Sequence, residues 1–256
     1  YNGTAWSTGA SLNTGRQQLM GLGTQNNALA VSGYNSGNKT CVEKYDGSTW
    51  SNDVPVPLAF RDGDGGDTST TAASLFGGIG PAIQGNTYLY TTTTDIDSSI
   101  PYCLGAWSGA TAMITGRSYM CSVGTQNAAV VMGGRTPSNL SATEEFDGSN
   151  WSTGGSLITA RHDAAGAGSQ NATLLTGGSG GTTSNEEYNG SSWSSANAIP
   201  AARYSNATAG TQNAAIIATG YNGSGNLSTS AEYDGTNWSA GGDVVQSRRQ
   251  LNGTGT

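Results

Sequence analysis

The hydrophobic residues of this chain fall in short clusters that recur at a regular spacing. An arginine follows each tryptophan after 10 or 11 residues, and a glycine follows each of the first five arginines after 17 residues. The tryptophans stand at positions 6, 50, 107, 151, 193 and 238, and the arginines at 16, 61, 117, 161, 203 and 248. The chain is therefore an internal repeat with a period of about 44 residues and one longer unit of 57 residues, from Trp50 to Trp107.

Each unit predicts four short strands. A mixed strand follows the arginine, and a Gly-Thr-Gln-Asn turn, as at 124–127, leads into an apolar strand such as 128–132. Asparagine tolerates a positive φ, so this turn suits a tight hairpin. A third strand ends in Glu and Tyr or Phe, and an Asp-Gly or Asn-Gly pair, as at 147–148, predicts a second hairpin before the strand that carries the tryptophan.

Four antiparallel strands in each unit, repeated along one chain, predict an all-β propeller that forms a single domain over residues 1–256. The expected blades span about 16–50, 61–107, 117–151, 161–193 and 203–238. Residues 1–6 have the pattern of a fourth strand and 248–256 that of a first strand, so a half-repeat strand flanks the five complete repeats at each end. Five apolar second strands favour five blades. The alternatives are a six-bladed ring whose last blade lacks its middle strands, and a piece cut from a longer array.

The Gly-Gly after the second strand, the Glu-Tyr-Asp, the tryptophan and the arginine together resemble the kelch repeat. The resemblance is closer to Gly/Thr/Asn-rich kelch-like arrays of phage tail and structural proteins and of secreted bacterial proteins, which residues 146–178 match almost throughout. This resemblance implies an extracellular or virion-associated module and supplies no catalytic residue.

Charge and composition exclude several classes of function. Only 11% of the residues are charged, the net charge is −7 and the pI is about 4.5, which argues against a surface for nucleic acid. No apolar run approaches the roughly 18 residues of a membrane span. The chain has neither a starting Met nor a signal peptide, so a processed product or a fragment is expected. One histidine and three cysteines leave little for metal or nucleophile chemistry, so we expect no enzyme.

Most of the repeated polar residues have an expected structural role. The tryptophans should pack between blades. Each arginine should pair with the glutamate before the tyrosine or with backbone carbonyls, because a buried charge requires a partner. The predicted partners are Glu43, Glu145, Glu187 and Glu232. His162 should be a loop residue. Cys41, Cys103 and Cys121 should be single buried thiols, with pairing of Cys103 and Cys121 as the alternative.

The strand order also predicts where a ligand binds. The tight turns share one face of the propeller, and the second-to-third and fourth-to-first loops, which differ between units, share the other. The expected variable loops lie at 34–40, 80–100, 135–141, 179–185 and 221–230. Exposed tyrosines are adaptable contacts for protein or glycan. The predicted ligand-binding residues on this face are Tyr34, Tyr88, Tyr90, Tyr204 and Tyr221.

The second unit departs from the repeat because Asp62, Asp64 and Asp67 follow its arginine and a longer loop after Gly78 adds Asp95 and Asp97. Carboxylates among glycines predict either a solvated acidic loop or a calcium site, since calcium accepts flexible all-oxygen coordination. Asp62, Asp64 and Asp67 are the candidate ligands.

The expected function is a non-enzymatic extracellular or virion-associated interaction or adhesion module that presents variable loops to a protein or a cell-surface glycan. Two alternatives stay open. One is a lectin with glycan pockets between blades. The other is a structural subunit of a fibre or virion that self-associates through its end strands, because an unpaired strand edge is a template for pairing.

Overall fold

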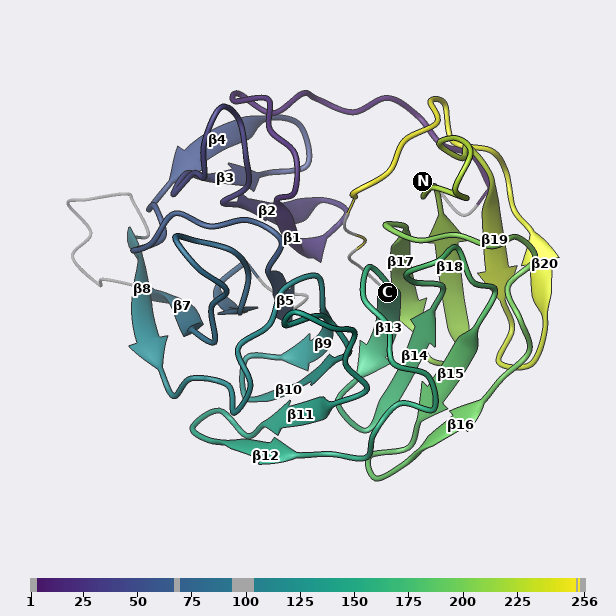
Figure 1. Cartoon of the computed structure of the whole chain (residues 1–256). Helices are drawn as coiled ribbons and strands as arrows, with labels where there is room; N and C mark the ends of the chain where they lie inside the picture. Colours follow the sequence, from purple (N-terminus) through teal and green to yellow (C-terminus); the bar gives the residue numbers. More distant parts are fainter. Residues whose placement is uncertain (1–3, 67–69, 94–103, 252, 254–256) are drawn as a thin grey trace.

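The protein is a five-bladed β-propeller. The computed structural model describes residues 4–66, 70–93, 104–251 and 253, and within these residues there are strands and no helices. Five four-stranded antiparallel sheets lie side by side in a ring (Figure 1). The all-β class and the five predicted blades are thus confirmed.

The blades follow one another in sequence order. Blade 1 comprises β1 (Met20–Thr24), β2 (Asn27–Val31), β3 (Val42–Tyr45) and β4 (Trp50–Asp53). Blade 2 comprises β5 (Asp64–Gly66), β6 (Ala72–Phe76), β7 (Thr87–Thr93) and β8 (Leu104–Ala110). Blade 3 comprises β9 (Cys121–Thr125), β10 (Ala128–Met132), β11 (Thr143–Phe146) and β12 (Trp151–Thr153). Blade 4 comprises β13 (Ala165–Ser169), β14 (Ala172–Thr176), β15 (Asn185–Tyr188) and β16 (Trp193–Ser195). Blade 5 comprises β17 (Ala207–Thr211), β18 (Ala214–Ala218), β19 (Ser230–Tyr233) and β20 (Trp238–Ala240).

The Gly-Thr-Gln-Asn turns form the predicted tight hairpins. In blade 3 the turn joins β9 to β10 and pairs Thr125 with Ala128. Gly124, at the start of the turn, has a φ of 113°, and a Cβ there would lie 2.2 Å from the Ala128 carbonyl oxygen. A residue with a side chain is excluded by both its backbone angle and its space, so the glycine of this repeat is required by geometry.

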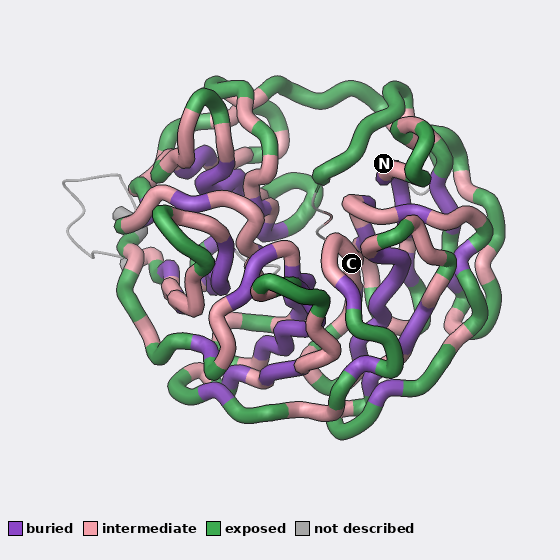
Figure 2. The backbone as a smooth tube through the Cα atoms, viewed as in Figure 1, coloured by how far each residue is buried: buried purple, intermediate pink, exposed green. Residues whose placement is uncertain are grey.

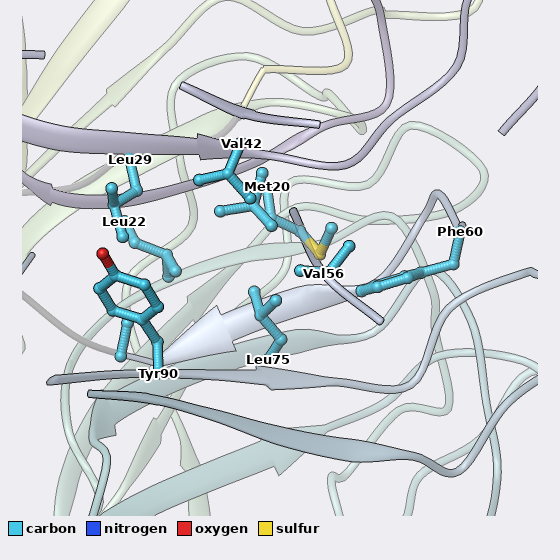
Figure 3. Close-up of a cluster of buried hydrophobic side chains, with 10 residues drawn as sticks. Met20, Leu22, Leu29, Val42, Val56, Phe60, Leu75 and Tyr90 are labelled. Carbon is cyan, nitrogen blue, oxygen red and sulfur yellow. The ribbon is translucent and has the colours of Figure 1, made fainter. Parts of the chain in front are cut away.

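The hydrophobic core lies between the blades. Figure 2 shows that the inner strands are largely buried and that the outer rim is exposed. At the junction of blades 1 and 2, Met20 and Leu22 pack with Leu75 and Tyr90 (Figure 3). Trp193 of blade 4 is buried and donates its indole N–H to the Thr143 hydroxyl of blade 3, 3.0 Å away. The tryptophans of the blades therefore join neighbouring blades, as the sequence predicts.

The extra residues of blade 2 are not in its second-to-third loop. β7 begins at Thr87 and runs for seven residues, so 80–100 is not a single loop, and the additional chain lies between β7 and β8. The aromatic and β-branched run from Thr87 to Thr93 favours a strand, and it extends the sheet. Ten residues, 77–86, separate β6 from β7, as ten residues, 133–142, separate β10 from β11, so the second-to-third loop of blade 2 has the usual length. Asp95 and Asp97 lie outside the described residues.

The buried arginines find partners, although two predicted partners are displaced by one residue. Arg16 pairs with Glu43 as predicted. Arg117 pairs with Glu144, and Arg161 with Glu186 at 2.7 Å. Alternate residues of a strand point to opposite faces, and this places the neighbouring glutamates elsewhere. Glu145 and Glu187 instead accept hydrogen bonds from the hydroxyls of Tyr188 and Tyr233 in the following blades.

Two blades lack the arginine–glutamate pair. In blade 5, Ala231 stands at the glutamate position, and Arg203 donates to the Thr219 and Thr229 carbonyl oxygens instead. In blade 2, Phe60 and not Arg61 occupies the arginine position. The Phe60 carbonyl accepts the Gly33 N–H at 3.1 Å, as the Arg161 carbonyl accepts the Gly134 N–H at 2.9 Å. Arg61 is thereby displaced onto the face that carries the second-to-third and fourth-to-first loops, which we call the loop face.

Candidate functional site

A ring of six residues surrounds the centre of the propeller on the loop face. Each stands two positions after the arginine or phenylalanine of its unit, and all six line one cavity of about 120 Å³, the central cavity. All six also have a positive φ, between 51° and 58°, although none is glycine. The ring consists of Gln18, Asp62, Tyr119, Asp163, Ser205 and Gln250. Left-handed backbone is costly for residues with a side chain, and it concentrates at functional sites.

Backbone hydrogen bonds connect the ring from one blade to the next. The Tyr119 N–H donates to the Asp62 carbonyl at 3.0 Å, and the Asp163 N–H donates to the Tyr119 carbonyl at 2.9 Å. The series continues from Ser205 to Asp163 at 2.8 Å and from Gln250 to Ser205 at 2.9 Å. The left-handed conformation directs each ring N–H toward the carbonyl of the preceding ring residue. The contacts between blades therefore fix the backbone of the ring and with it the starting points of its side chains.

The pKa values of two carboxyl groups in the ring, those of Asp62 and Asp163, are raised. The pKa of Asp163 rises to about 6, first through burial and then through the Asp62 carboxylate, and Arg135 and Arg249 oppose this rise. Burial also raises the pKa of Asp62, against hydrogen bonds from Tyr119, Arg61 and Gln18. The pKa of Tyr119 rises to about 12, through burial and then through the negative charge of Asp62. The cavity therefore gathers hydrogen-bond acceptors whose charge is only partly compensated.

Arginines lie over tyrosines around this ring. The Arg61 guanidinium is 4.8 Å from the centre of the Tyr34 ring, and that of Arg249 is 4.5 Å from the Tyr221 ring. Tyr204 meets Tyr221 edge to face, with ring centres 5.5 Å apart. These half-buried tyrosines lie outside the central cavity, and Tyr204 directly precedes the ring residue Ser205. The structure thus brings Tyr204 and Tyr221 into contact, and pairs Tyr34 with Arg61 separately.

Tyr88 and Tyr90 do not belong to that face, in contrast to the prediction. Both are on β7, and Tyr90 is 1% exposed within the core between blades 1 and 2 (Figure 3). Its hydroxyl donates to the Asp53 carboxylate at 2.9 Å. Tyr88 packs against the same core beside Phe60. The prediction is wrong because the unit length alone does not show which turn carries the insertion, and 80–100 contains a strand.

The candidate calcium ligands do not form a metal centre in the part of the chain that the structure describes. Asp64 is buried, and its carboxylate accepts the backbone N–H groups of Gly65 at 2.9 Å and Ser122 at 2.6 Å. Asp62 accepts the Gln18 side-chain amide at 3.0 Å. The described residues hold no group of three His, Cys, Asp or Glu side chains that could bind a metal. Asp67 lies outside them, so calcium binding stays an untested prediction.

On the opposite face, the hairpin face, the Asp-Gly turns share one hydrogen-bond pattern. The carboxylate of Asp46 accepts the N–H groups of Ser48 and Thr49, both at 2.8 Å, and Asp147 and Asp234 repeat this turn. These N–H groups lower the pKa of each of the three aspartates. The aspartates of the hairpin face thus have a structural role.

Two other reactive side chains lie near the ring: His162 contacts Tyr119, and Cys121 lines the central cavity. The His162 Nδ1 lies 2.8 Å from the Asn139 side-chain oxygen, and its ring meets Tyr119 edge to face. Burial and the charge of Arg135 lower its pKa. Cys41 and Cys121 are free thiols as predicted, but only Cys121 is buried, whereas Cys41 is half buried. Cys103 lies outside the described residues.

Sequence reasoning missed most of the ring. Gln18, Tyr119, Asp163, Ser205 and Gln250 were not candidates, because no motif marks them. The signal available was their shared offset from the repeat arginine, where polar residues of different kinds replace one another from unit to unit.

Comparisons with known proteins support the fold. No protein-family model matches the chain, and no curated protein matches it significantly. The solved structure of YjhT superimposes with a TM-score of 0.74 at 14% sequence identity, covering 95% of this chain and 88% of that one. The likeness concerns the propeller fold. Among the described residues there is no helix long and apolar enough to cross a membrane.

Proposed function

We propose that this protein is a non-enzymatic binding module whose ligand enters the central cavity on the loop face. The observation that carries the proposal is the ring of six left-handed polar residues around one cavity. Six separate repeat units each supply one side chain to it, and the backbone hydrogen bonds between neighbours fix their positions. A preorganised pocket with a few convergent polar groups is the usual form of a ligand site.

The chemistry of the ring favours a glycan. Asp62 and Asp163 offer carboxylate oxygens to hydroxyl donors, Gln18 and Gln250 offer amides, and Tyr119 offers an aromatic face with a hydroxyl. A polyhydroxylated ligand can satisfy such mixed donors and acceptors without a compensating charge. The tyrosines and arginines outside the ring would contact the following sugar residues. A protein partner on the same face is the alternative within this proposal.

The wider setting of this module is also proposed. Kelch-like repeats of this composition suggest an extracellular or virion-associated protein, such as a phage tail component, that adheres to a cell-surface glycan. The hairpin face, which binds no glycan in this proposal, would then attach the module to a larger assembly.

A glycan array probed with the purified protein tests the proposal. We expect binding to a restricted set of glycans, and loss of that binding in Asp163→Asn and Tyr119→Phe, which alter the ring with little change of volume. Asp147→Asn, on the hairpin face, is the matched control and should bind as the wild type does. Absence of binding to every glycan, or equal effects of ring and control variants, would contradict the proposal.

One observation favours a second candidate function. Asp62 and Asp163 have raised pKa values in the same cavity, and paired carboxyl groups of this kind serve as acid and base in enzymes. The candidate is acid–base chemistry on a bound sugar. Incubation of each glycan that binds with the protein, followed by mass spectrometry and NMR, separates the two: an altered glycan favours the enzyme and an unchanged one the binding module.

A further inference from the structure

A space beside blade 5, called the wedge, is lined by described residues from the N-terminal segment 6–12 and from the C-terminal segment 248–253. In Figure 1 the purple N-terminal segment runs along the rim toward β1, and the yellow C-terminal segment turns from β20 toward the centre of the ring. Between them lies a cavity of about 790 Å³, much larger than the central cavity. Its lining includes Trp6, Ala209, Ile216 and Leu251.

The two end segments occupy repeat positions on the inner and outer sides of this wedge. The Arg248 carbonyl accepts the Gly220 N–H at 2.9 Å, as the Arg203 carbonyl accepts the Gly178 N–H at 3.0 Å. A Cβ on Gly253 would lie 2.4 Å from the Thr208 carbonyl oxygen, so the C-terminal segment runs directly beside β17. These residues stand where the first strand of a further blade would begin.

The N-terminal segment matches the outer strand in the same way. The Trp50 indole N–H donates to the Ala10 carbonyl at 3.2 Å, and the Trp238 indole N–H donates to the Asn197 carbonyl at 3.2 Å. Ala10 is four residues after Trp6, as Asn197 is four residues after Trp193. In every complete blade two more strands separate the inner strand from the outer one. The wedge therefore lacks the two middle strands of a blade.

The blade 5 wall of the wedge is less buried than its equivalent elsewhere. On blade 4, Leu174 and Ala167 are 0% and 4% exposed, because Ala215 and Tyr233 of blade 5 cover them. The corresponding residues of blade 5, Ile216 and Ala209, are only half buried and line the cavity.

The face of blade 1 that corresponds to the covered faces of other blades shows the same difference, although Tyr45 itself does not line the cavity. Tyr45 is half buried, whereas the equivalent Tyr90, Tyr188 and Tyr233 are 1%, 0% and 4% exposed. The hydroxyls of Tyr188 and Tyr233 donate to Glu145 and Glu187 of the preceding blade. No such carboxylate reaches Tyr45 within the described residues. A third strand that carries a glutamate beside Tyr45 would give its hydroxyl the same hydrogen bond.

In the described part of the chain, two carbonyl groups on blade 5 also lack the contact that a following blade provides elsewhere. The Gln212 side-chain amide donates to the Thr173 and Tyr188 carbonyls of the blade before it, at 3.1 and 2.8 Å, and Gln170 and Gln126 do the same one and two blades earlier. The corresponding carbonyls of blade 5 belong to Ala215 and Tyr233. No glutamine among the described residues reaches them.

We propose that the wedge is a docking site for a β-hairpin of another polypeptide that carries the repeat's own second and third strands. Its first strand begins with Gln-Asn and continues with small and branched apolar residues, and its second ends in two glutamates. The hairpin completes the backbone pairing between the two end segments, covers Ile216 and Ala209, and brings a glutamate to Tyr45. This is binding by strand addition, in which main-chain bonds supply affinity and side-chain pockets supply specificity. The proposal does not depend on the ligand at the central cavity.

A synthetic peptide with the sequence of residues 170–187 tests the docking site. It contains the middle hairpin of blade 4 and ends before Tyr188. In the sequence Tyr1 precedes Trp6 by five residues, as Tyr188 precedes Trp193, so the chain already contains the tyrosine of this repeat position. Calorimetric titration into the intact chain should give one peptide per protein, and the thermal midpoint should rise with peptide concentration. A scrambled peptide should do neither.

Two variants of the protein locate the peptide. Ile216→Lys places a charge on the wedge wall and should weaken binding at least about tenfold, because the ammonium group would be buried without a partner. Ile158→Lys is the matched control, since Ile158 is 58% exposed and lies away from the wedge, beside blade 4. Both variants should keep the wild-type circular dichroism spectrum.

A double-mutant cycle tests the register. Tyr45→Phe and a peptide with Glu187→Ala should each weaken binding about tenfold, and together no more than either alone, because both remove the same hydrogen bond. Three outcomes would overturn the proposal: no binding at millimolar peptide, equal binding by Ile216→Lys and Ile158→Lys, or a dimer of the protein that Ile216→Lys dissociates, which would make a second copy the occupant.

Discussion

Phe60 stacks on Tyr88, with ring centres 6.3 Å apart and planes inclined by 27°, at the repeat position where Arg117 pairs with Glu144 in blade 3. A third position changes with this pair. The N–H of Ile114 donates to Glu144 at 2.8 Å, and the equivalent residue of blade 2 is Pro57, which has no N–H. Blade 5 lacks the glutamate as well, and there the equivalent residue is Pro200. The donor is thus absent in both blades where its acceptor is absent.

Removal of one partner of the buried pair should be costly. We expect Glu144→Ala to lower the free energy of unfolding by about 3–5 kcal/mol, because Arg117 would be left as a buried and uncompensated charge. Urea denaturation followed by tryptophan fluorescence measures this change. Asp243→Ala is the control and should change stability little. The Asp243 side chain is exposed, and no arginine of the described residues pairs with it.

Replacement of the whole set should restore stability. The triple variant Arg117→Phe, Glu144→Tyr, Ile114→Pro gives blade 3 the residues that blade 2 has at these positions. We expect its free energy of unfolding to lie within about 2 kcal/mol of the wild-type value, since an apolar pair of similar volume can replace a buried ion pair. A triple variant no more stable than Glu144→Ala would show that the two sets are not interchangeable.

The turn glycines should not tolerate a side chain. Gly124→Ala should destabilise the fold by at least about 2 kcal/mol, because its φ of 113° and the Ala128 carbonyl at 2.2 Å both disfavour a Cβ. Gly9→Ala is the matched control, since nothing lies within 4 Å of its Cβ position. Thermal unfolding of the two variants checks the difference, and equal midpoints would be inconsistent with this geometry.

The raised pKa of Asp163 predicts a pH-dependent stability. Its pKa rises from 3.8 to about 6 on folding, so the folded state holds the proton more tightly than the unfolded state does. The resulting stabilisation is complete below about pH 4 and is lost as the pH rises through 6. Asp163→Asn should therefore match the wild type at a pH of about 3.5 and exceed its stability by roughly 2–3 kcal/mol at a pH of about 8. Denaturation curves at both values measure this.

The hairpin aspartates give the opposite sign and serve as the control. Backbone N–H groups lower the pKa of Asp147 in the folded chain. The stabilisation from its carboxylate is present above a pH of about 4 and is lost on acidification. Asp147→Asn should therefore be less stable than the wild type at neutral and higher pH, and the two should converge at low pH. A stabilising Asp147→Asn would mean that the two aspartate classes have been assigned wrongly.

The outer tyrosines should contribute to binding more than to folding. Tyr221→Ala removes contacts with Arg249 and Tyr204 on the surface, which should cost about 0.5–1.5 kcal/mol of stability. Tyr34→Ala removes the contact with Arg61. Both variants should remain folded by circular dichroism and bind the selected glycan more weakly. Unchanged binding in both would remove the outer tyrosines from the site.

The repeat made the architecture predictable, and departures from it did not follow from spacing. Trp193 and the Gly124 turn lie where the period puts them, because each blade repeats the same local choices. The partner of Arg117 was misplaced by one residue, since two adjacent glutamates in a strand point to opposite faces and the sequence does not say which is inward. Arg61 was aligned with the other arginines, although Phe60 holds that place. The central cavity arises only when six distant segments meet, so no local motif marked its ring residues.

Ligand binding at the central cavity on the loop face is tested most directly by isothermal titration of the strongest glycan from the array into wild type, Asp163→Asn and Asp147→Asn. We expect Asp163→Asn to weaken binding at least about tenfold while it stabilises the fold at a pH of about 8, because the strained carboxylate serves the ligand and not the core. Asp147→Asn should bind as the wild type does. Full affinity in Asp163→Asn, with loss of affinity in Asp147→Asn, would contradict this site and place the ligand on the hairpin face.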